Sequence, residues 1–214
     1  MALILNAEKA LIFRITHIAN VPWILTNGLH CKSAEKYDPA FVQIGNPELI
    51  TKRRARPVPI APGGTLSEYI PFYFTPYSMM MFNIRTGYGG IRQFPNSEIV
   101  IMVSSLKGLA ESGVSAIYTD RHAYLHAARF FTSMDHLDQI DWPLLQRKDF
   151  KRDVDDPEKT DRYQAEALIH GHLPIERLRG IVSFGENEKR TLERHCREAG
   201  VNLTIVGQPG WYFQ

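Results

Sequence analysis

The sequence predicts an α+β fold, in which strands and helices share a core. Two segments rich in β-branched and apolar residues, Leu11–His17 and Glu98–Leu106, are typical of buried strands. A third observation is the amphipathic pattern from Asn187 to Ala199, where acidic residues near the start and basic residues near the end match the helix dipole. These elements lie far apart in the sequence, so we expect them to meet through long-range packing.

Composition restricts the class of protein. The 214 residues are enough for one sizeable core, and a net charge of +2 is too small to indicate nucleic-acid binding from bulk charge alone. Cys31 and Cys196 have no metal-like spacing, so we expect free thiols in a reducing, cytoplasmic setting. The N-terminus lacks the features of a signal peptide, and no apolar run is long enough to span a membrane.

The first strand, Leu11–His17, leads into a short helix. Asn20 is the expected N-cap, Pro22 suits the first turn, and Asn27-Gly28 is expected to end the helix with a left-handed cap. We expect this compact unit to place His17 and Gly28 near each other at one rim. A histidine at a strand end is more often structural than functional, and the residues alone leave both interpretations open.

Residues 31–61 show little periodicity, apart from a helix-like NPELITKRR. A loop of this length is usually functional or disordered. Lys52, Arg53, Arg54 and Arg56 form the densest basic cluster in the chain. The cluster is either a solvated face or a phosphate site, because a guanidinium can bind phosphate through two donors.

The next segment, Ser67–Phe82, crowds aromatic residues between prolines. Tyr73 and Phe74 lie between Pro71 and Pro76, which predicts an edge strand that leads into a cleft wall. These rings either pack in the core or form a platform for a heteroaromatic ligand.

Val114–Thr119 predicts another strand, after which Asp120 is expected to cap a helix over RHAYLHAARFF. From Thr132 to Asp161 the chain is polar and charged. We expect either a solvent-facing helical insert or a lobe that contacts substrate.

Glu166 begins the apolar segment that ends before Gly171 and Pro174. Glutamate is depleted in strands, and a buried carboxylate is costly unless it is paired or used. Glu166 is therefore either a strand-edge residue in solvent or a salt bridge, or a catalytic carboxylate at the mouth of a cleft.

Strands over Gly180–Phe184 and VNLTIVG follow, and the tail Gly210–Phe213 is expected to pack back on the sheet. The chain has no P-loop, dinucleotide fingerprint, zinc spacing or nucleophile elbow.

Four stretches together resemble the DarT family of bacterial toxins, which ADP-ribosylate single-stranded DNA. They are FRITHIANVPWILTNGLHC, VQIGNPELITKRRARPVPIAPGGTLSEYIPFYFTPYSMM, LDQIDWPLLQRKDFKRDVDDPEKTDRYQAEALI and the terminal GWYF. They span nearly the whole chain in the family's order. The resemblance implies a single ADP-ribosyltransferase domain over residues 1–214, with a split mixed β-core, flanking helices and a helical insert. It also implies NAD as ADP-ribose donor, thymine in single-stranded DNA as acceptor, no metal, no membrane, a macrodomain antitoxin (DarG) as partner, and a monomer.

The resemblance also assigns residues. Glu166 matches the catalytic glutamate, and Arg53, rather than Arg54, matches the essential arginine in the loop of about 31–61 that covers NAD. The resemblance implies NAD contacts at His17, Ile18, Ala19, Gly28, Leu29, Arg53, Tyr73 and Phe74. It makes residues from about 119 to 162 the DNA-contacting region, with Tyr118, Thr119, His122, Tyr124, Arg129, Trp142, Arg147 and Lys148 as contacts.

These residue types suit the implied chemistry. Cleavage of the nicotinamide–ribose bond develops positive charge on the ribose, which a carboxylate such as Glu166 can stabilise and orient. Arg53 can hold the pyrophosphate or stabilise a deprotonated thymine, although a guanidinium is too basic to act as the proton acceptor. Rings and cations are what single-strand grooves use. Two other hypotheses are an ADP-ribosyltransferase that acts on RNA or protein, and a non-catalytic nucleic-acid-binding module.

Overall fold

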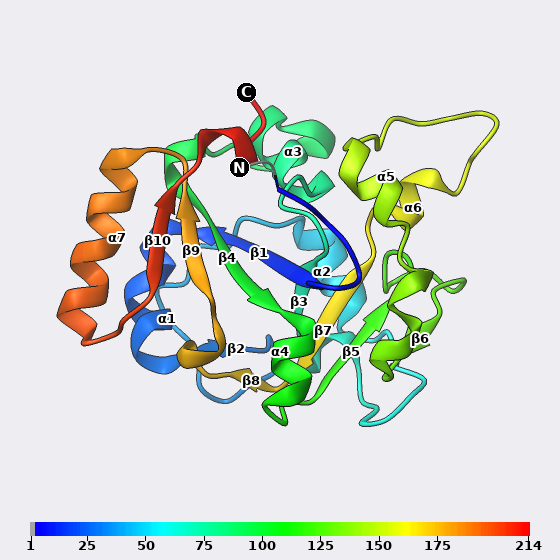
Figure 1. Ribbon diagram of the computed structural model, residues 1–214, viewed down its shortest axis with the longest axis horizontal. Coiled ribbons are helices and arrows are strands. Elements are labelled where there is room, and N and C mark those ends of the chain that lie inside the picture. Colours follow the sequence, from blue (N-terminus) through cyan, green and yellow to red (C-terminus); the bar gives the residue numbers. More distant parts are fainter. Residues whose placement is uncertain (1–2) are drawn as a thin grey trace.

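The computed structural model describes residues 3–214 and places a large mixed sheet at the centre of the molecule (Figure 1). Its eight strands lie in the order β10-β9-β4-β1-β3-β7-β5-β6, while β2 and β8 form a separate two-stranded sheet. Only β9 and β10 are registered in parallel within residues 3–214, and the other strand pairs are antiparallel. This arrangement confirms the predicted α+β class.

The strands are β1 (Leu11–His17), β2 (Leu29–His30), β3 (Tyr69–Tyr73), β4 (Ile99–Ser105), β5 (Ala116–Thr119), β6 (Phe130–Phe131), β7 (Glu166–His170), β8 (His172–Leu173), β9 (Gly180–Ser183) and β10 (Thr204–Gly207). The helices are α1 (Val21–Asn27), α2 (Pro47–Arg53), α3 (Met79–Thr86), α4 (Leu106–Glu111), α5 (Trp142–Arg147), α6 (Lys159–Arg162) and α7 (Glu186–Ala199). Helices α1 and α7 pack against each other beside β10, and α5 and α6 lie at the opposite end of the molecule (Figure 1).

The large sheet is split between β1 and β3. Strand β1 pairs with β4 along its whole length, but it meets β3 at only one registered pair, Phe13↔Tyr73. Strand β3 is therefore a central strand between β1 and β7, and the edge-strand prediction was wrong. Pro71 is tolerated there because its carbonyl, which accepts a hydrogen bond from Arg14 Nη1 at 2.8 Å, faces the split. The Pro71 nitrogen also faces the split, where the sheet has no inter-strand hydrogen bond to lose, so the missing N–H of proline is not costly.

The helix expected after Asp120 does not form. The Asp120 carboxylate is buried, and it accepts hydrogen bonds from the backbone N–H of Arg129 at 3.0 Å and from its Nε at 2.9 Å. Because these bonds join residues nine positions apart, they close residues 120–129 into a loop. The predicted helical end, Phe130–Phe131, instead forms β6 against β5.

The segment from Thr132 to Asp161 is less solvent-facing than expected. Leu137 of a 3-10 helix (Met134–Gln139) and Leu144 and Leu145 of α5 are buried in the core. The later residues 151–155 are exposed, as a solvent-facing insert requires.

Two local predictions for α1 need correction. Asn20 makes no capping hydrogen bond to α1, since its amide donates to Thr16 Oγ1 and to the carbonyl of Val42. Gly28 does follow the helix with a positive φ of 76°, but its ψ of −173° is extended rather than left-handed helical. This backbone turn leads directly into β2.

The C-terminal tail packs on the sheet, as predicted. The buried Tyr212 hydroxyl donates toward the carbonyls of Ile99 and Val182, at 3.1 and 2.9 Å, and Trp211 meets Phe13 edge-on. These contacts tie the chain end to β4 and β9. Across residues 3–214, the structure contains no helix with the length and apolar character needed to cross a membrane.

Candidate active site

The centre of the candidate site is an ion pair between Arg53 and Glu166. Glu166 is the first residue of β7 and is 1% exposed, while Arg53 is the last residue of α2 and 12% exposed at its side chain. The two guanidinium nitrogens donate to the two carboxylate oxygens at 3.0 and 2.9 Å. Arg54, by contrast, is exposed. The structure thus brings together the two side chains to which the resemblance assigns catalysis.

Local sequence explains how Arg53 reaches this point. Asn46 caps α2 through its side-chain oxygen, which accepts from the N–H groups of Glu48 and Leu49, and Pro47 occupies the first turn. The helix then runs for seven residues and delivers Arg53 at its last position. Because an arginine at a helix C-terminus also suits the helix dipole, this placement is favourable before any contact with Glu166.

The pair keeps both groups charged. Burial would raise the pKa of the Glu166 carboxyl, but the charge of Arg53, the neighbouring His122 and the hydrogen bonds from Arg53 lower it below its ordinary value. Burial would likewise lower the pKa of Arg53, and Glu166 raises it instead. Glu166 is therefore an ionised carboxylate near neutral pH.

His122 is the next side chain around Glu166. Its Nε2 lies 3.7 Å from Glu166 Oε1, and its Nδ1 accepts a hydrogen bond from the N–H of Tyr124 at 3.1 Å. The neutral ring therefore carries its proton on Nε2, which faces the carboxylate. Burial and the charge of Arg53 lower the pKa of His122, although Glu166 acts in the opposite sense. The sequence suggested His122 as a DNA contact, but nothing in it indicated this proximity to Glu166.

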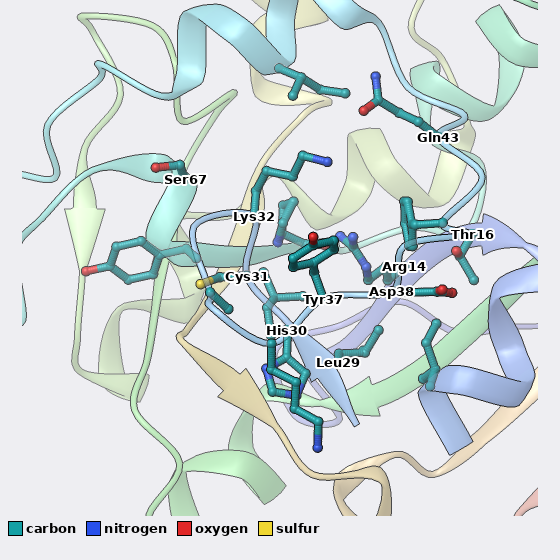
Figure 2. A pocket seen from close by; sticks show the side chains of 18 of the residues that line it. Arg14, Thr16, Leu29, His30, Cys31, Lys32, Tyr37, Asp38, Gln43 and Ser67 are labelled. Atoms are coloured by element: carbon teal, nitrogen blue, oxygen red, sulfur yellow. The ribbon is translucent and has the colours of Figure 1, made fainter. Parts of the chain in front are cut away.

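A cavity of about 400 Å³ opens at the split in the sheet; Arg53 lines it, whereas Glu166, behind Arg53 in the ion pair, does not. Its floor includes Arg14 from β1 and Pro71 from β3, and Arg53 contributes to its wall. Figure 2 shows the side chains of Arg14, Lys32 and Tyr37 around it. The lining combines cations with rings: Arg14, Lys32, Lys36 and Arg53, and Trp23, Tyr37, Phe41 and Tyr69. A dinucleotide offers the complementary groups, phosphates and flat heterocycles, so the residues present fit NAD.

Some of the predicted NAD contacts line the cavity and others do not. Arg53 and Leu29 line the cavity, whereas His17, Ile18, Ala19, Gly28 and Tyr73 are not part of its lining. His17 lies at the end of β1, where its Nδ1 accepts from the N–H of Ala19 and its Nε2 lies 3.1 Å from Glu98 Oε2.

Gly28 and Tyr73 lie close to strands of the site. A Cβ atom at Gly28 would lie 2.6 Å from the carbonyl oxygen of Leu173, so only glycine fits against β8. Tyr73 is half-buried and registered directly opposite Glu166. Burial and Glu166 raise the pKa of its hydroxyl, which keeps the ring neutral.

Phe74 is a correction. It is fully buried, and its ring meets those of Tyr118 and Trp142 edge-on, at centroid distances of 6.3 and 5.4 Å. These contacts leave no ring face available for nicotinamide. The alternation of a strand explains the difference from Tyr73, because successive side chains point to opposite faces.

Three predicted DNA contacts are also core residues. The hydroxyl of Tyr118 donates to the carbonyl of Ser133, Thr119 Oγ1 donates to the carbonyl of Arg121, and Trp142 Nε1 donates to the carbonyl of Leu137, each at 2.7 Å. All three side chains are buried. Their polar groups are satisfied inside the fold, so direct contact with a DNA strand was a wrong prediction for them.

The other predicted DNA contacts are more accessible. Arg129, Arg147 and Lys148 are exposed and Tyr124 is partly buried, while His122 belongs to the centre of the site. The Lys148 ammonium lies 3.6 Å from the ring centroid of Tyr77.

Sequence reasoning missed Arg14 and His30, which both line the cavity. For Arg14 a signal existed, because a charged residue in the middle of an otherwise apolar strand needs a reason. Within residues 3–214, no group of three or more His, Cys, Asp or Glu side chains is arranged to hold a metal ion.

Comparisons with known proteins show which family the chain belongs to. Residues 13–213 match the family model described as "ssDNA thymidine ADP-ribosyltransferase, DarT". A DNA ADP-ribosyl transferase from Escherichia coli O127:H6 is 51% identical over 209 residues, which cover 98% of this chain and 96% of that protein.

Solved structures are similar over the same span. Thermus sp. 2.9 DarT in complex with ADP-ribosylated single-stranded DNA superimposes with a TM-score of 0.87 at 28% identity, covering 100% of both chains. The same Thermus protein in complex with NAD+ has a TM-score of 0.79 at 27% identity, covering 96% of this chain and 98% of that one. The chain therefore belongs to the DarT family of single-stranded DNA thymidine ADP-ribosyltransferases.

Proposed function

We propose that this protein transfers ADP-ribose from NAD to thymine bases of single-stranded DNA and releases nicotinamide. The observation that carries the proposal is the buried Arg53–Glu166 pair at the edge of a cavity of about 400 Å³ lined by cations and rings. The names of the E. coli and Thermus relatives supply the reaction class. NAD is the donor substrate, and the reaction needs no metal.

The chemistry assigns distinct roles to the pair. The bond between ribose C1′ and the nicotinamide nitrogen breaks, and its electron pair leaves with nicotinamide. Glu166, an anion on a rigid strand, binds the ribose hydroxyls and stabilises the positive charge that develops on the sugar. A thymine ring nitrogen loses its proton to solvent, and the resulting anion forms the new bond to C1′. Arg53 stabilises the anionic thymine electrostatically, because its guanidinium stays protonated.

Residues 31–61 cover the donor. Lys32, Lys36, Tyr37 and Phe41 from this segment line the cavity, and Arg53 belongs to it as well. Tyr37 is 71% exposed, so its ring is free to stack on a heterocycle. His17, Ile18, Ala19, Gly28 and Leu29 form the rim at which the adenosine and nicotinamide ends rest. Of the two predicted stacking residues, Tyr73, opposite Glu166, is retained for nicotinamide and Phe74 is not.

Residues 119–162 hold the DNA strand. Tyr124, Arg129, Arg147 and Lys148 supply the accessible ring and cations of a single-strand groove, and His122 faces the target base. Tyr118, Thr119 and Trp142 contribute indirectly, because they anchor this region to the sheet.

The biological setting follows from the family. A toxin of this kind requires an antidote, and we propose a macrodomain antitoxin, DarG, as the partner. We further propose that the protein acts as a monomer in the cytoplasm, where NAD and transient single-stranded DNA are both present.

A direct experiment tests the reaction. The protein is incubated with NAD and defined single-stranded DNA, RNA and protein acceptors, and products are read by mass spectrometry. We expect one ADP-ribose added to thymine-containing DNA, and a loss of at least about 100-fold in rate for Glu166→Gln. The matched control is Glu176→Gln, an exposed glutamate of the 3-10 helix Ile175–Arg177, which should react like the wild type.

Other outcomes distinguish the alternatives. Modification of RNA or protein but not DNA would move the acceptor, while binding of oligonucleotide without NAD turnover would indicate a non-catalytic module. Equal product from Glu166→Gln would remove Glu166 from its role.

A further inference from the structure

Arg14 carries a buried guanidinium that the roles above do not use. It lies in the middle of β1 and lines the cavity beside the Arg53–Glu166 pair (Figure 2). Within residues 3–214, its recorded hydrogen bond is the one from Nη1 to the carbonyl of Pro71 at 2.8 Å. Its Nε is buried and has no partner among the described residues. Nε of Arg56 and Arg121 is in the same state, so what sets Arg14 apart is that it is a cation on the cavity lining whose Nη2 makes no hydrogen bond within residues 3–214.

The other guanidinium of the cavity is in a different situation. Arg53 has both oxygens of Glu166 as acceptors, whereas Arg14 has only one neutral carbonyl. The pKa of Arg14 is lowered to about 10, mainly by burial. Tyr73 acts to raise this pKa, and the charge of Arg53 acts to lower it. The lining holds four cations, Arg14, Lys32, Lys36 and Arg53, against one carboxylate, Asp38, so positive charge remains in the cavity even though Glu166 offsets the charge of Arg53. A bound anion is therefore favourable at this position.

The free donors of Arg14 have a defined geometry. Because Pro71 engages Nη1 and Nε is buried, Nη2 is the nitrogen that remains for a ligand in the cavity. A charge-assisted N–H donor of this kind suits a phosphate oxygen. The Pro71 contact also restricts rotation of the guanidinium, which reduces the entropy lost when a ligand binds.

We infer that Arg14 is a substrate-binding residue, which holds a phosphate of the donor dinucleotide through Nη2. The inference rests on the proposed function, since it assumes that the cavity takes NAD. It assigns the pyrophosphate to β1 and leaves Arg53 free to act with Glu166 at the reacting sugar. Lys32 and Lys36, on the covering segment, are exposed and can approach the same phosphates from the other side.

The test compares Arg14→Gln with the wild type. ADP-ribose retains the pyrophosphate, so its dissociation constant, measured by calorimetry, is the first readout. We expect Arg14→Gln to bind it about 10- to 100-fold more weakly, the loss typical of a hydrogen bond to a charged group. The KM for NAD should rise by a similar factor, while the KM for the oligonucleotide stays unchanged. The matched control is Arg194→Gln, an exposed arginine on α7, which should bind ADP-ribose like the wild type.

A second probe separates phosphate binding from a purely structural role. Nicotinamide has no phosphate, so its inhibition constant should be the same for Arg14→Gln and the wild type. If Arg14 only tethers β1 to β3, affinities for ADP-ribose and nicotinamide should fall together with the thermal midpoint, and the inference is overturned. Should Arg14→Gln fail to fold, Arg14→Lys carries the test. Lysine keeps the charge but lacks the planar guanidinium that Pro71 orients, and we expect about fivefold weaker ADP-ribose binding.

The outcomes distinguish the inference from the proposed function. If the wild type neither binds ADP-ribose nor modifies DNA, the proposed function itself fails. If the wild type does both and each Arg14 variant that folds binds ADP-ribose within twofold of it, only the assignment of Arg14 is wrong.

Discussion

Replacing Arg53 by alanine should destabilise the fold in a pH-dependent way. The change leaves Glu166, which is 1% exposed, without its two guanidinium donors. Removing one partner of a buried ion pair typically costs about 3–5 kcal/mol, because the other charge stays buried and uncompensated. At about 2–4 °C per kcal/mol for a protein of this size, we expect a fall in thermal midpoint of about 6–20 °C at pH 7.5.

The sign of the pH dependence follows from the pKa of Glu166. In the wild type this pKa is lowered, so the pair stabilises the fold above the unfolded-state pKa, and that contribution is lost as pH falls through the folded-state value. In Arg53→Ala, burial acts without the opposing charge and raises the pKa of Glu166. The variant should therefore lose stability as pH rises from about 5 to 7.5, over a range where the wild-type pair is intact.

Urea denaturation followed by tryptophan fluorescence at pH 5 and pH 7.5 measures both effects. Arg54→Ala is the matched control, because Arg54 is exposed and its loss should change the free energy of unfolding by less than about 0.5 kcal/mol. A cost below about 1 kcal/mol for Arg53→Ala, or an equal cost at the two pH values, would refute the reasoning. Adding Glu166→Ala should restore part of the stability, since it removes the buried charge.

Three further predictions concern two packed residues of the fold and one exposed residue of the proposed DNA groove. Trp142→Ala should cost about 3–5 kcal/mol of unfolding free energy, because the ring packs on Phe74 and its Nε1 is hydrogen-bonded. Gly28→Ala should cost more than about 1 kcal/mol, since φ is 76° and the new Cβ would lie 2.6 Å from the oxygen of Leu173; chemical denaturation measures both changes. Lys148→Gln should weaken oligonucleotide binding and reduce the slope of log affinity against log salt by about one, as titrations at several salt concentrations can show.

Each of these predictions has a contrary result. A fully stable Trp142→Ala that has lost DNA affinity would return Trp142 to the DNA surface. A stable Gly28→Ala would mean that β8 can move away from α1. Salt-independent oligonucleotide binding would exclude residues 119–162 as an electrostatic groove.

Local sequence patterns were sufficient to predict much of the secondary structure. The dense apolar strand around Glu98–Leu106 and the amphipathic helix that became α7 follow from periodicity, which each segment carries in itself. The sequence also predicts α2, from the helix-like segment that begins at Asn46 and Pro47. The role expected for Glu166 came from the resemblance to the DarT family, and a carboxylate at the start of a strand was consistent with it.

Burial and pairing were decided only by the tertiary structure. Tyr73 and Phe74 are adjacent aromatic residues, yet one lies opposite Glu166 and the other is sealed between Tyr118 and Trp142. Asp120 is a good helix cap by type, but its carboxylate is satisfied by Arg129 instead. Such outcomes depend on which distant side chains arrive at the same place, and no local period encodes that.

The sequence by itself determined that this chain forms strands and helices of given lengths and that it resembles one enzyme family. The tertiary structure decided that a guanidinium from α2 reaches the carboxylate of β7, 113 positions away, and that the split beside β1 leaves Arg14 facing a cavity. The physical reason is that secondary structure follows from short-range sterics and hydrogen bonding, whereas an electrostatic site requires groups that only the packed core can bring within 3 Å of each other.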